Sequence, residues 1–236
     1  MSTSRGTSAT GPGQTQPAAA VEARSLYRFF RAGEEQTLAL QGVSLSVAPG
    51  ELVVVTGPSG SGKSTLLACL AGLDDPDGGT AWVEGRPISH QPEPVRAQIR
   101  AQRIGFFGQS ANLFEHLTVD ANLAFVRAVG RRSHRCSREA ILRSVGLERR
   151  TGAYPSELSG GEAARAGLAV ALANDPAVVF ADEPTGELDS TTEADVLELL
   201  VSATAGGVAV LVASHSPAVA ATADRVVQLE DGRVVR

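Results

Sequence analysis

Short apolar runs alternate with longer amphipathic stretches over much of this chain. The runs ELVVVT at 51–56, AVVFA at 177–181 and VAVLVA at 208–213 carry few polar residues, which is typical of strands buried on both faces of a parallel sheet. Helical patterns fill residues 160–174 and 190–204, before and after the second run. Strands separated by helices of this length predict βαβ units, and therefore an α/β fold with a parallel core sheet.

Two further parts flank and interrupt this core. Residues 21–48 alternate as strands around a turn at 31–34, which predicts an antiparallel β subdomain. Residues from about 110 to 158 are mostly helical, and the clearest helices fall at 117–130 and 137–147. Because this stretch interrupts the strand and helix alternation, we expect it to form a separate helical lobe.

The first twenty residues differ in composition from the rest. Residues 1–20 are rich in Ser, Thr, Gly and Pro and lack an apolar segment, so we expect a disordered tail and no signal peptide. The folded domain should occupy residues 21–236. No stretch approaches the ~18 apolar residues that a membrane span needs. Any membrane role is therefore expected to come through a partner.

A glycine-rich loop follows the first apolar run and contains Lys63, the only lysine of the chain. Glycines let backbone N–H groups wrap a phosphate chain, and a lysine places a compact positive charge on the β- and γ-phosphates. The hydroxyl of Ser64 is suited to Mg²⁺. A helix after the loop would present its N-terminus to the same anion. The predicted nucleotide-binding residues are Gly57, Pro58, Ser59, Gly60, Ser61, Gly62, Lys63, Ser64 and Thr65.

A pair of acids ends the second apolar run, in the sequence AVVFADEP at 177–184. Ligands of parallel α/β sheets bind at the carboxyl ends of the strands, so both carboxylates should face the phosphate loop. Asp182 is placed to hold Mg²⁺, directly or through water. Glu183 is placed to orient and deprotonate the attacking water.

A second candidate anion site is LSGGE at 158–162, which opens the helix predicted at 160–174. Ser159 could cap that helix, while Gly160 and Gly161 would expose N–H groups at its positive end. A glycine-containing helix cap alone would explain the motif. Because one phosphate loop already serves one nucleotide, the second site instead suggests contact with another nucleotide across a dimer.

Six elements in order resemble the ATP-binding subunits of ABC transporters, from about residue 21 to the C-terminus. They are GPSGSGKST, Gln109 after IGFFG, LSGGE, VVFADEP, ELD at 187–189 and ASHS with His215. The stretches AGEEQTLALQGVSLSVAPGE, LAGLDDPDGGT and ADEPTGELD resemble the subgroup of lipoprotein-release, macrolide-export and cell-division complexes. The resemblance implies a P-loop NTPase that uses ATP and Mg²⁺.

The resemblance also assigns roles within one nucleotide site. Phe30 would stack on adenine, although Phe29 or Tyr27 could serve instead. Gln109 would bind Mg²⁺, sense the γ-phosphate and couple the site to the membrane partner. His215 would contact the γ-phosphate and hold the catalytic geometry.

Other roles belong to a head-to-tail dimer that closes on two ATP molecules. Ser159, Gly160 and Gly161 would bind the γ-phosphate held by the other subunit's loop, and Asp189 would link the two sites. The resemblance further implies a separate integral membrane permease as partner. The chain would then lie on the cytoplasmic face of the cell membrane, driving export or extraction of a substrate from the membrane.

Several positions depart from the family pattern without removing a group from the chemistry. Ala163 and Ala164 stand where glutamines are usual, and Val170 stands where arginine is common. Gly108 replaces a bulky residue, and Ser216 replaces an aspartate. We expect such changes to slow ATP turnover or to alter how the helical lobe contacts its partner.

Net charge and cysteine content restrict the classes of partner and ligand that we expect. A net charge of −5 and a pI near 5.4 predict no nucleic-acid partner. Cys69 and Cys136 fit no disulfide or metal pattern, and Cys69 is expected to be a small buried hydrophobe. Residues 110–155 nevertheless carry a net +4, which favours either a solvated face or contact with anionic lipid headgroups or an acidic permease loop. The basic residues of this stretch are Arg127, Arg131, Arg132, Arg135, Arg138, Arg143, Arg149 and Arg150.

Two alternatives to a transport ATPase stay open. One is an ATPase that regulates a membrane partner without transport. The other is a soluble ABC ATPase of DNA repair or chromosome maintenance. Residues 66–157, between the two phosphate motifs, lack the heptads and cysteine pairs of that class.

Overall fold

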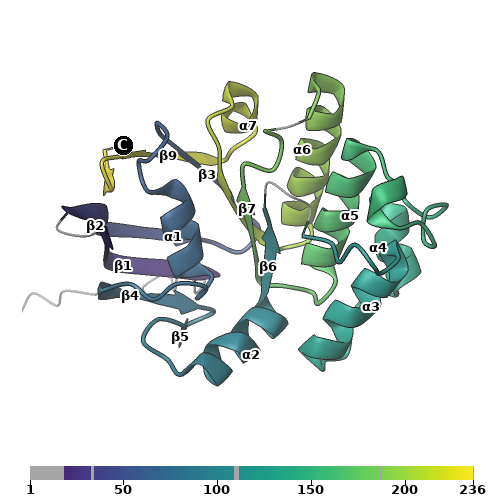
Figure 1. Cartoon of the computed structure of the whole chain (residues 1–236), viewed down its shortest axis with the longest axis horizontal. Coiled ribbons are helices and arrows are strands. Elements are labelled where there is room, and N and C mark those ends of the chain that lie inside the picture. Colours follow the sequence, from purple (N-terminus) through teal and green to yellow (C-terminus); the bar gives the residue numbers. More distant parts are fainter. Residues whose placement is uncertain (1–18, 33–34, 109–111, 187, 236) are drawn as a thin grey trace, which may run out of the picture.

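The computed structural model describes residues 19–32, 35–108, 112–186 and 188–235. Gln109 and most of the predicted tail lie outside these ranges. Ala20, at the end of that predicted tail, is buried, and its N–H donates to the carbonyl of Val47 at 2.8 Å. Two sheets form the core, with helices between and around them (Figure 1).

The larger sheet has six strands in the order β10-β9-β3-β8-β7-β6. Neighbours from β9 to β6 run parallel, and the short edge strand β10 pairs antiparallel with β9. This sheet confirms the predicted α/β fold with a parallel core. Its strands are β3 (Leu52–Thr56), β6 (Ile104–Phe107), β7 (Val178–Asp182), β8 (Ala209–Ala213), β9 (Arg225–Glu230) and β10 (Arg233–Val234).

The smaller sheet is antiparallel, in the order β2-β1-β4-β5. It confirms the antiparallel subdomain, whose first two strands were predicted around the turn at 31–34. The strands are β1 (Val21–Ala32), β2 (Glu35–Val47), β4 (Gly78–Val83) and β5 (Arg86–Pro87).

Helix α1 (Lys63–Leu70) lies between the two sheets (Figure 1). Leu66, Leu67 and Leu70 are fully buried in one cluster with side chains of both sheets. Cys69 lies in the same cluster, as expected of a small hydrophobe, and burial raises the pKa of its thiol to about 12. The helix that begins at the phosphate loop is therefore fixed by the core on both sides.

The central strand β3 serves two clusters because successive side chains point to opposite faces. Val53 and Val55 join the cluster around α1, whereas Leu52 and Val54 face a second cluster with α5 and α6. The remaining helices of this core are α2 (Glu93–Arg103), α5 (Gly160–Leu172), α6 (Ser190–Ala205) and α7 (Pro217–Ala221).

Helices α3 (Val119–Gly130) and α4 (Arg138–Ser144) form the predicted helical lobe, at the right of Figure 1. Leu123 and Leu142 pack there against Ala166 and Ala169 of α5, in a third cluster. Helix α5 thus contributes to two clusters and joins the lobe to the sheet. Within the described ranges, no helix has the length and apolar character needed to cross a bilayer.

Candidate functional site

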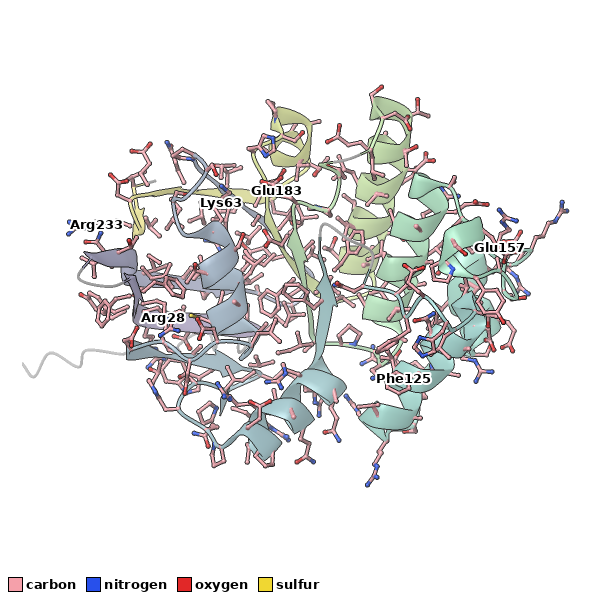
Figure 2. The ribbon with its side chains drawn as sticks, viewed as in Figure 1. Arg28, Lys63, Phe125, Glu157, Glu183 and Arg233 are labelled. Atoms are coloured by element: carbon pink, nitrogen blue, oxygen red, sulfur yellow. The ribbon has the colours of Figure 1, made fainter. Side chains whose placement is uncertain are left out.

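A cavity of 570 Å³ opens where β3, β7 and β8 end. Lys63 and Glu183 lie close to one another at this edge of the sheet (Figure 2). Most of the predicted phosphate-binding loop lines it, as do Glu183 and His215, two of the three predicted catalytic residues. The lining consists of Gly57, Pro58, Ser59, Gly60, Gly62, Lys63, Ser64, Thr65, Glu183, Gly186 and His215.

The loop is held in place by a close backbone approach at Gly62. This residue precedes α1 with φ +101°, and a Cβ there would lie 2.2 Å from the carbonyl oxygen of Ala39 in β2. No side chain fits in that space, so glycine is required. The antiparallel sheet therefore fixes the position at which α1 presents its N-terminus to the cavity.

The ammonium of Lys63 is bound by the loop itself. Its Nζ donates to the carbonyls of Gly57 at 2.8 Å and Pro58 at 3.0 Å, and the residue is only 9% exposed. These carbonyls keep a nearly buried cation at the mouth of the cavity. An anion entering the cavity would meet this charge directly.

Ser64 and Asp182 bring two oxygen groups together beside the lysine. The Ser64 hydroxyl donates to Oδ1 of Asp182 at 3.0 Å. Burial raises the pKa of Asp182, and the nearby Glu183 adds to the rise, while the Ser64 hydrogen bond and Lys63 oppose it. A hydroxyl and a partly desolvated carboxylate form a donor set that suits a small divalent cation.

Glu183 is held by two residues from the loop after β8. His215 Nδ1 lies 2.9 Å from Oε1 of Glu183, and the Ser214 hydroxyl donates to Oε2 at 3.2 Å. Because an ionised carboxylate can only accept, Nδ1 carries the proton in this arrangement. Glu183 has a left-handed backbone, φ +47°, and its N–H donates to the carbonyl of Ala213. Glu183 and His215, both expected from the sequence to act in hydrolysis, are thus hydrogen-bonded to each other within one chain.

Four residues around this site were not predicted as site residues from the sequence. Ser214 is nearly fully buried beneath Glu183, and Thr185 is buried two residues after it. The hydroxyls of Thr185 and Ser216 both donate to Oε1 of Glu193, each at 3.0 Å. Hydroxyl residues within three positions of the ends of buried strands were the available signal for Ser214 and Thr185.

Ser159 forms a reciprocal cap at the start of α5. Its hydroxyl accepts from the N–H of Glu162 at 3.2 Å, and the Glu162 carboxylate accepts from the N–H of Ser159 at 2.9 Å. The guanidinium of Arg150 donates two hydrogen bonds to the same carboxylate, at 2.8 and 3.1 Å. Arg150 and the N–H of Ser159 lower the pKa of Glu162 from 4.5 to about 2.

The starts of α5 and α6 lie against each other. A Cβ at Gly161 would lie 2.5 Å from Cγ2 of Thr192, so glycine permits this contact. Asp189 caps α6 by accepting from the N–H groups of Thr191 and Thr192 and from the Thr192 hydroxyl. The structure thereby brings the LSGGE motif at 158–162 close to Asp189. The cavity lining includes no residue of 158–162, all of which the structure describes.

Phe30 lies on β1, 45% exposed, and is not part of the cavity lining. The guanidinium of Arg28 sits 4.9 Å from the centre of its ring, held there by Asp74 and Asp77. Gln109 lies outside the described residues, so its role stays a prediction.

Comparisons with known proteins agree with this geometry. The family model for "ABC transporter" matches residues 40–186. The macrolide export ATP-binding/permease protein MacB of Shigella flexneri is 40% identical over 219 residues, covering 92% of this chain and 34% of its own length. MacB of Escherichia coli (strain K12) is 39% identical with the same coverage. The chain thus spans about a third of the length of these relatives.

Two solved structures of a bacterial ABC transporter cassette, MJ0796, are similar. One is a dimer, with a TM-score of 0.84 and 33% identity, and covers 92% of this chain and 97% of its own. The other is a dimeric post-hydrolysis state bound to ADP and Pi, with a TM-score of 0.83, 34% identity and the same coverage.

The cap at Ser159 predicts a specific pH dependence of stability. A lowered pKa in the folded state stabilises the fold above the unfolded pKa of about 4.3, and this contribution is lost as the pH falls toward 2. Glu162→Gln should lower the free energy of unfolding by about 1 kcal/mol at pH 7, the usual scale of a helix cap.

Urea unfolding of both proteins at several pH values measures this difference, which should shrink between about pH 5 and pH 2. Glu198→Gln, at an exposed acid on α6, is the matched control and should show no such trend. A difference that stays constant with pH would contradict the assigned pairing.

Proposed function

The chain belongs to the ABC transporter family, and on that premise we propose that it binds and hydrolyses ATP to drive a separate membrane permease. The observation that carries this proposal is the convergence of Lys63, the Ser64–Asp182 pair and the Glu183–His215 pair on one cavity. Each group matches one requirement of phosphoryl transfer to water. The similar cassette bound to ADP and Pi supports the same chemistry.

Phosphate binding begins with an exchange of partners at Lys63. Its ammonium leaves the carbonyls of Gly57 and Pro58 for the β- and γ-phosphates, while the loop N–H groups and the α1 N-terminus bind the remaining oxygens. The ammonium of Lys63 therefore has hydrogen-bond acceptors both before and after the nucleotide binds.

The residues present fit Mg²⁺ as part of the substrate complex. In the described part of the chain, no cluster of three His, Cys, Asp or Glu residues could hold a metal alone. Mg²⁺ usually keeps one or two carboxylates plus substrate phosphates and water, and Ser64 with Asp182 provides that donor set. When bound, the ion neutralises charge on the phosphate oxygens.

Glu183 takes the proton of the attacking water. His215 donates to Oε1 and Ser214 to Oε2, so the carboxylate is oriented before water arrives. The Nε2 side of the exposed His215 ring is then available to the γ-phosphate.

A head-to-tail dimer would complete each site. In one chain, Ser159, Gly160 and Gly161 lie away from the cavity, at an N-terminal helix end suited to an anion. The Ser159 hydroxyl accepts one bond in the cap and keeps its proton free to donate to a phosphate. Asp189, close to this end, would contact the partner subunit. The dimeric MJ0796 cassettes support this arrangement.

Adenine would stack on Phe30, whose ring is almost half exposed. The cation–π contact with Arg28 fixes the ring in place. Gln109 would sense the γ-phosphate and Mg²⁺.

An exposed apolar patch on the helical lobe would dock the permease at the cytoplasmic face of the membrane. The patch consists of Phe114, Phe125 and Val129, each 44–52% exposed, with the two rings edge-to-face at 4.9 Å. Phe125 lies far across the molecule from Lys63 and Glu183 (Figure 2). The buried Asn122 holds the backbone of Phe114 in place: its side-chain oxygen accepts from the N–H of Phe114, and its side-chain NH₂ donates to the carbonyl of Phe114.

Export is the direction of transport that the names of the MacB relatives support.

Glu183→Gln tests the hydrolytic assignment. The amide keeps the shape of the side chain but cannot take a proton, so turnover should fall about 10²-fold or more while ATP still binds. Phosphate release and nucleotide affinity, measured side by side, separate the two effects. Hydrolysis near the wild-type rate would show that another group is the base.

Ser159→Arg tests the dimer. The arginine should block closure, so that ATP binds each monomer but ATP-dependent dimerisation and hydrolysis disappear. Ser159→Ala is the control for the cap, because it removes the capping oxygen without adding bulk and should cost about 1 kcal/mol of stability.

Mixing Ser159→Arg with Lys63→Ala chains sharpens this test. A head-to-tail pair then holds one site with both lesions and one intact site, so ATP-dependent dimerisation should partly return in sedimentation experiments. Full activity of Ser159→Arg alone would rule out the two-subunit site.

Phe125→Ser tests the docking face. Loss of the exposed ring should release the chain from membranes that contain its permease and remove permease-dependent stimulation, while basal hydrolysis persists. Val201→Ser changes an equally exposed apolar residue on α6 and should have no effect. Membrane sedimentation that is equal for both variants would place the permease elsewhere.

A further inference from the structure

Two hydroxyl groups from different loops converge on one carboxylate oxygen at the start of α6. Thr185 Oγ1 and Ser216 Oγ each donate to Oε1 of Glu193 at 3.0 Å. Thr185 is 5% exposed, and Glu193 lies in the first turn of the helix, one turn after the cap at Asp189. The carboxylate of Glu193 is partly buried and accepts hydrogen bonds from both hydroxyls.

These two loops carry the hydrolytic pair. Thr185 follows Glu183 by two residues, and Ser216 follows His215 directly. The N–H of Ser216 also donates to the hydroxyl of Ser214, which donates in turn to Glu183. A short chain of hydrogen bonds therefore runs from Glu193 to the base.

In the described residues, few other hydrogen bonds join the loop after β7 to the loop after β8. One is the backbone bond from the N–H of Glu183 to Ala213 at the strand ends. The others end on the carboxylate of Glu183 itself, from Ser214 and His215. Those two bonds weaken when the carboxylate of Glu183 takes a proton and loses its charge. The bonds to Glu193 involve no reacting atom and can persist through the reaction.

We propose that Glu193 is a positioning residue that holds the two hydrolytic loops at a fixed separation while Glu183 and His215 act. This role rests on the proposed ATP hydrolysis and adds to it a residue outside the cavity lining. Glu193 does not line the cavity in which the reacting groups meet. Its loss should therefore slow the chemical step and leave nucleotide binding, which depends on the phosphate loop, nearly unchanged.

The first test separates turnover from binding. Glu193→Ala removes both acceptor bonds and should lower kcat about tenfold, because small displacements of catalytic groups are costly, with ATP affinity changed less than about twofold. Glu193→Gln retains an acceptor oxygen and should keep most of the activity, even if the alanine variant folds poorly. Glu198→Ala, at an exposed acid on the same helix, is the matched control and should behave as wild type.

A charge exchange provides the second test. Ser216→Asp places a carboxylate against Glu193, and repulsion should separate the loops and lower kcat. Combined with Glu193→Ala, the new carboxylate can accept the Thr185 hydroxyl, so the double variant should be more active than either single variant. An effect of Ser216→Asp on kcat that changes from a loss to a gain when Glu193 is removed is expected of residues that share one hydrogen-bond network.

Each negative outcome is assigned to one proposal. Wild-type kcat in Glu193→Ala, an equal loss in Glu198→Ala, or independent effects in the double variant would overturn the role of Glu193 and leave the proposed function intact. Wild-type protein that binds ATP but does not hydrolyse it, alone or with its permease, would overturn the proposed function and this role with it.

Discussion

The confinement of α1 between two sheets is the constraint on which the site depends. Its apolar side chains are fully buried against both the parallel and the antiparallel sheet, and Lys63 at its first position is nearly buried too. Gly62 closes the arrangement, because no side chain fits against the carbonyl of Ala39. The cavity therefore needs no loop closure to exist; it follows from the packing of the core.

The parallel sheet places the remaining groups by topology. Strands β3, β7 and β8 are neighbours and end at the same edge, so residues more than a hundred positions apart in the chain meet there. This is why Ser64 reaches Asp182 and why His215 reaches Glu183. Apolar runs in the sequence predicted these three strands, and the motifs that follow them indicated which functional groups each strand end would carry. The capping of α5 by Ser159 was also foreseeable, because a serine three residues before an acid is a local signal.

Contacts that depend on tertiary structure could not be predicted in the same way. Glu193 lies eight residues after Thr185 and far from Ser216 in sequence, and no motif joins the three. The family pattern showed Ser216 only as a departure from aspartate, whereas the structure gives its hydroxyl a defined acceptor. The Arg28–Phe30 contact likewise depends on two aspartates some 45 residues along the chain, which position the guanidinium. Sequence patterns predict elements and local caps, but not which side chains fill the space between distant loops.

Helix α5 connects the helical lobe mechanically to the parallel sheet, because it packs against both. Alanines at 164 and 171 face the sheet, while those at 166 and 169 face the lobe, and Ser159 caps its free end. Small side chains on both faces let the sheet and the lobe pack closely against α5. A displacement of the lobe at Phe125 would therefore be passed to α5, whose N-terminus carries the Ser159 cap.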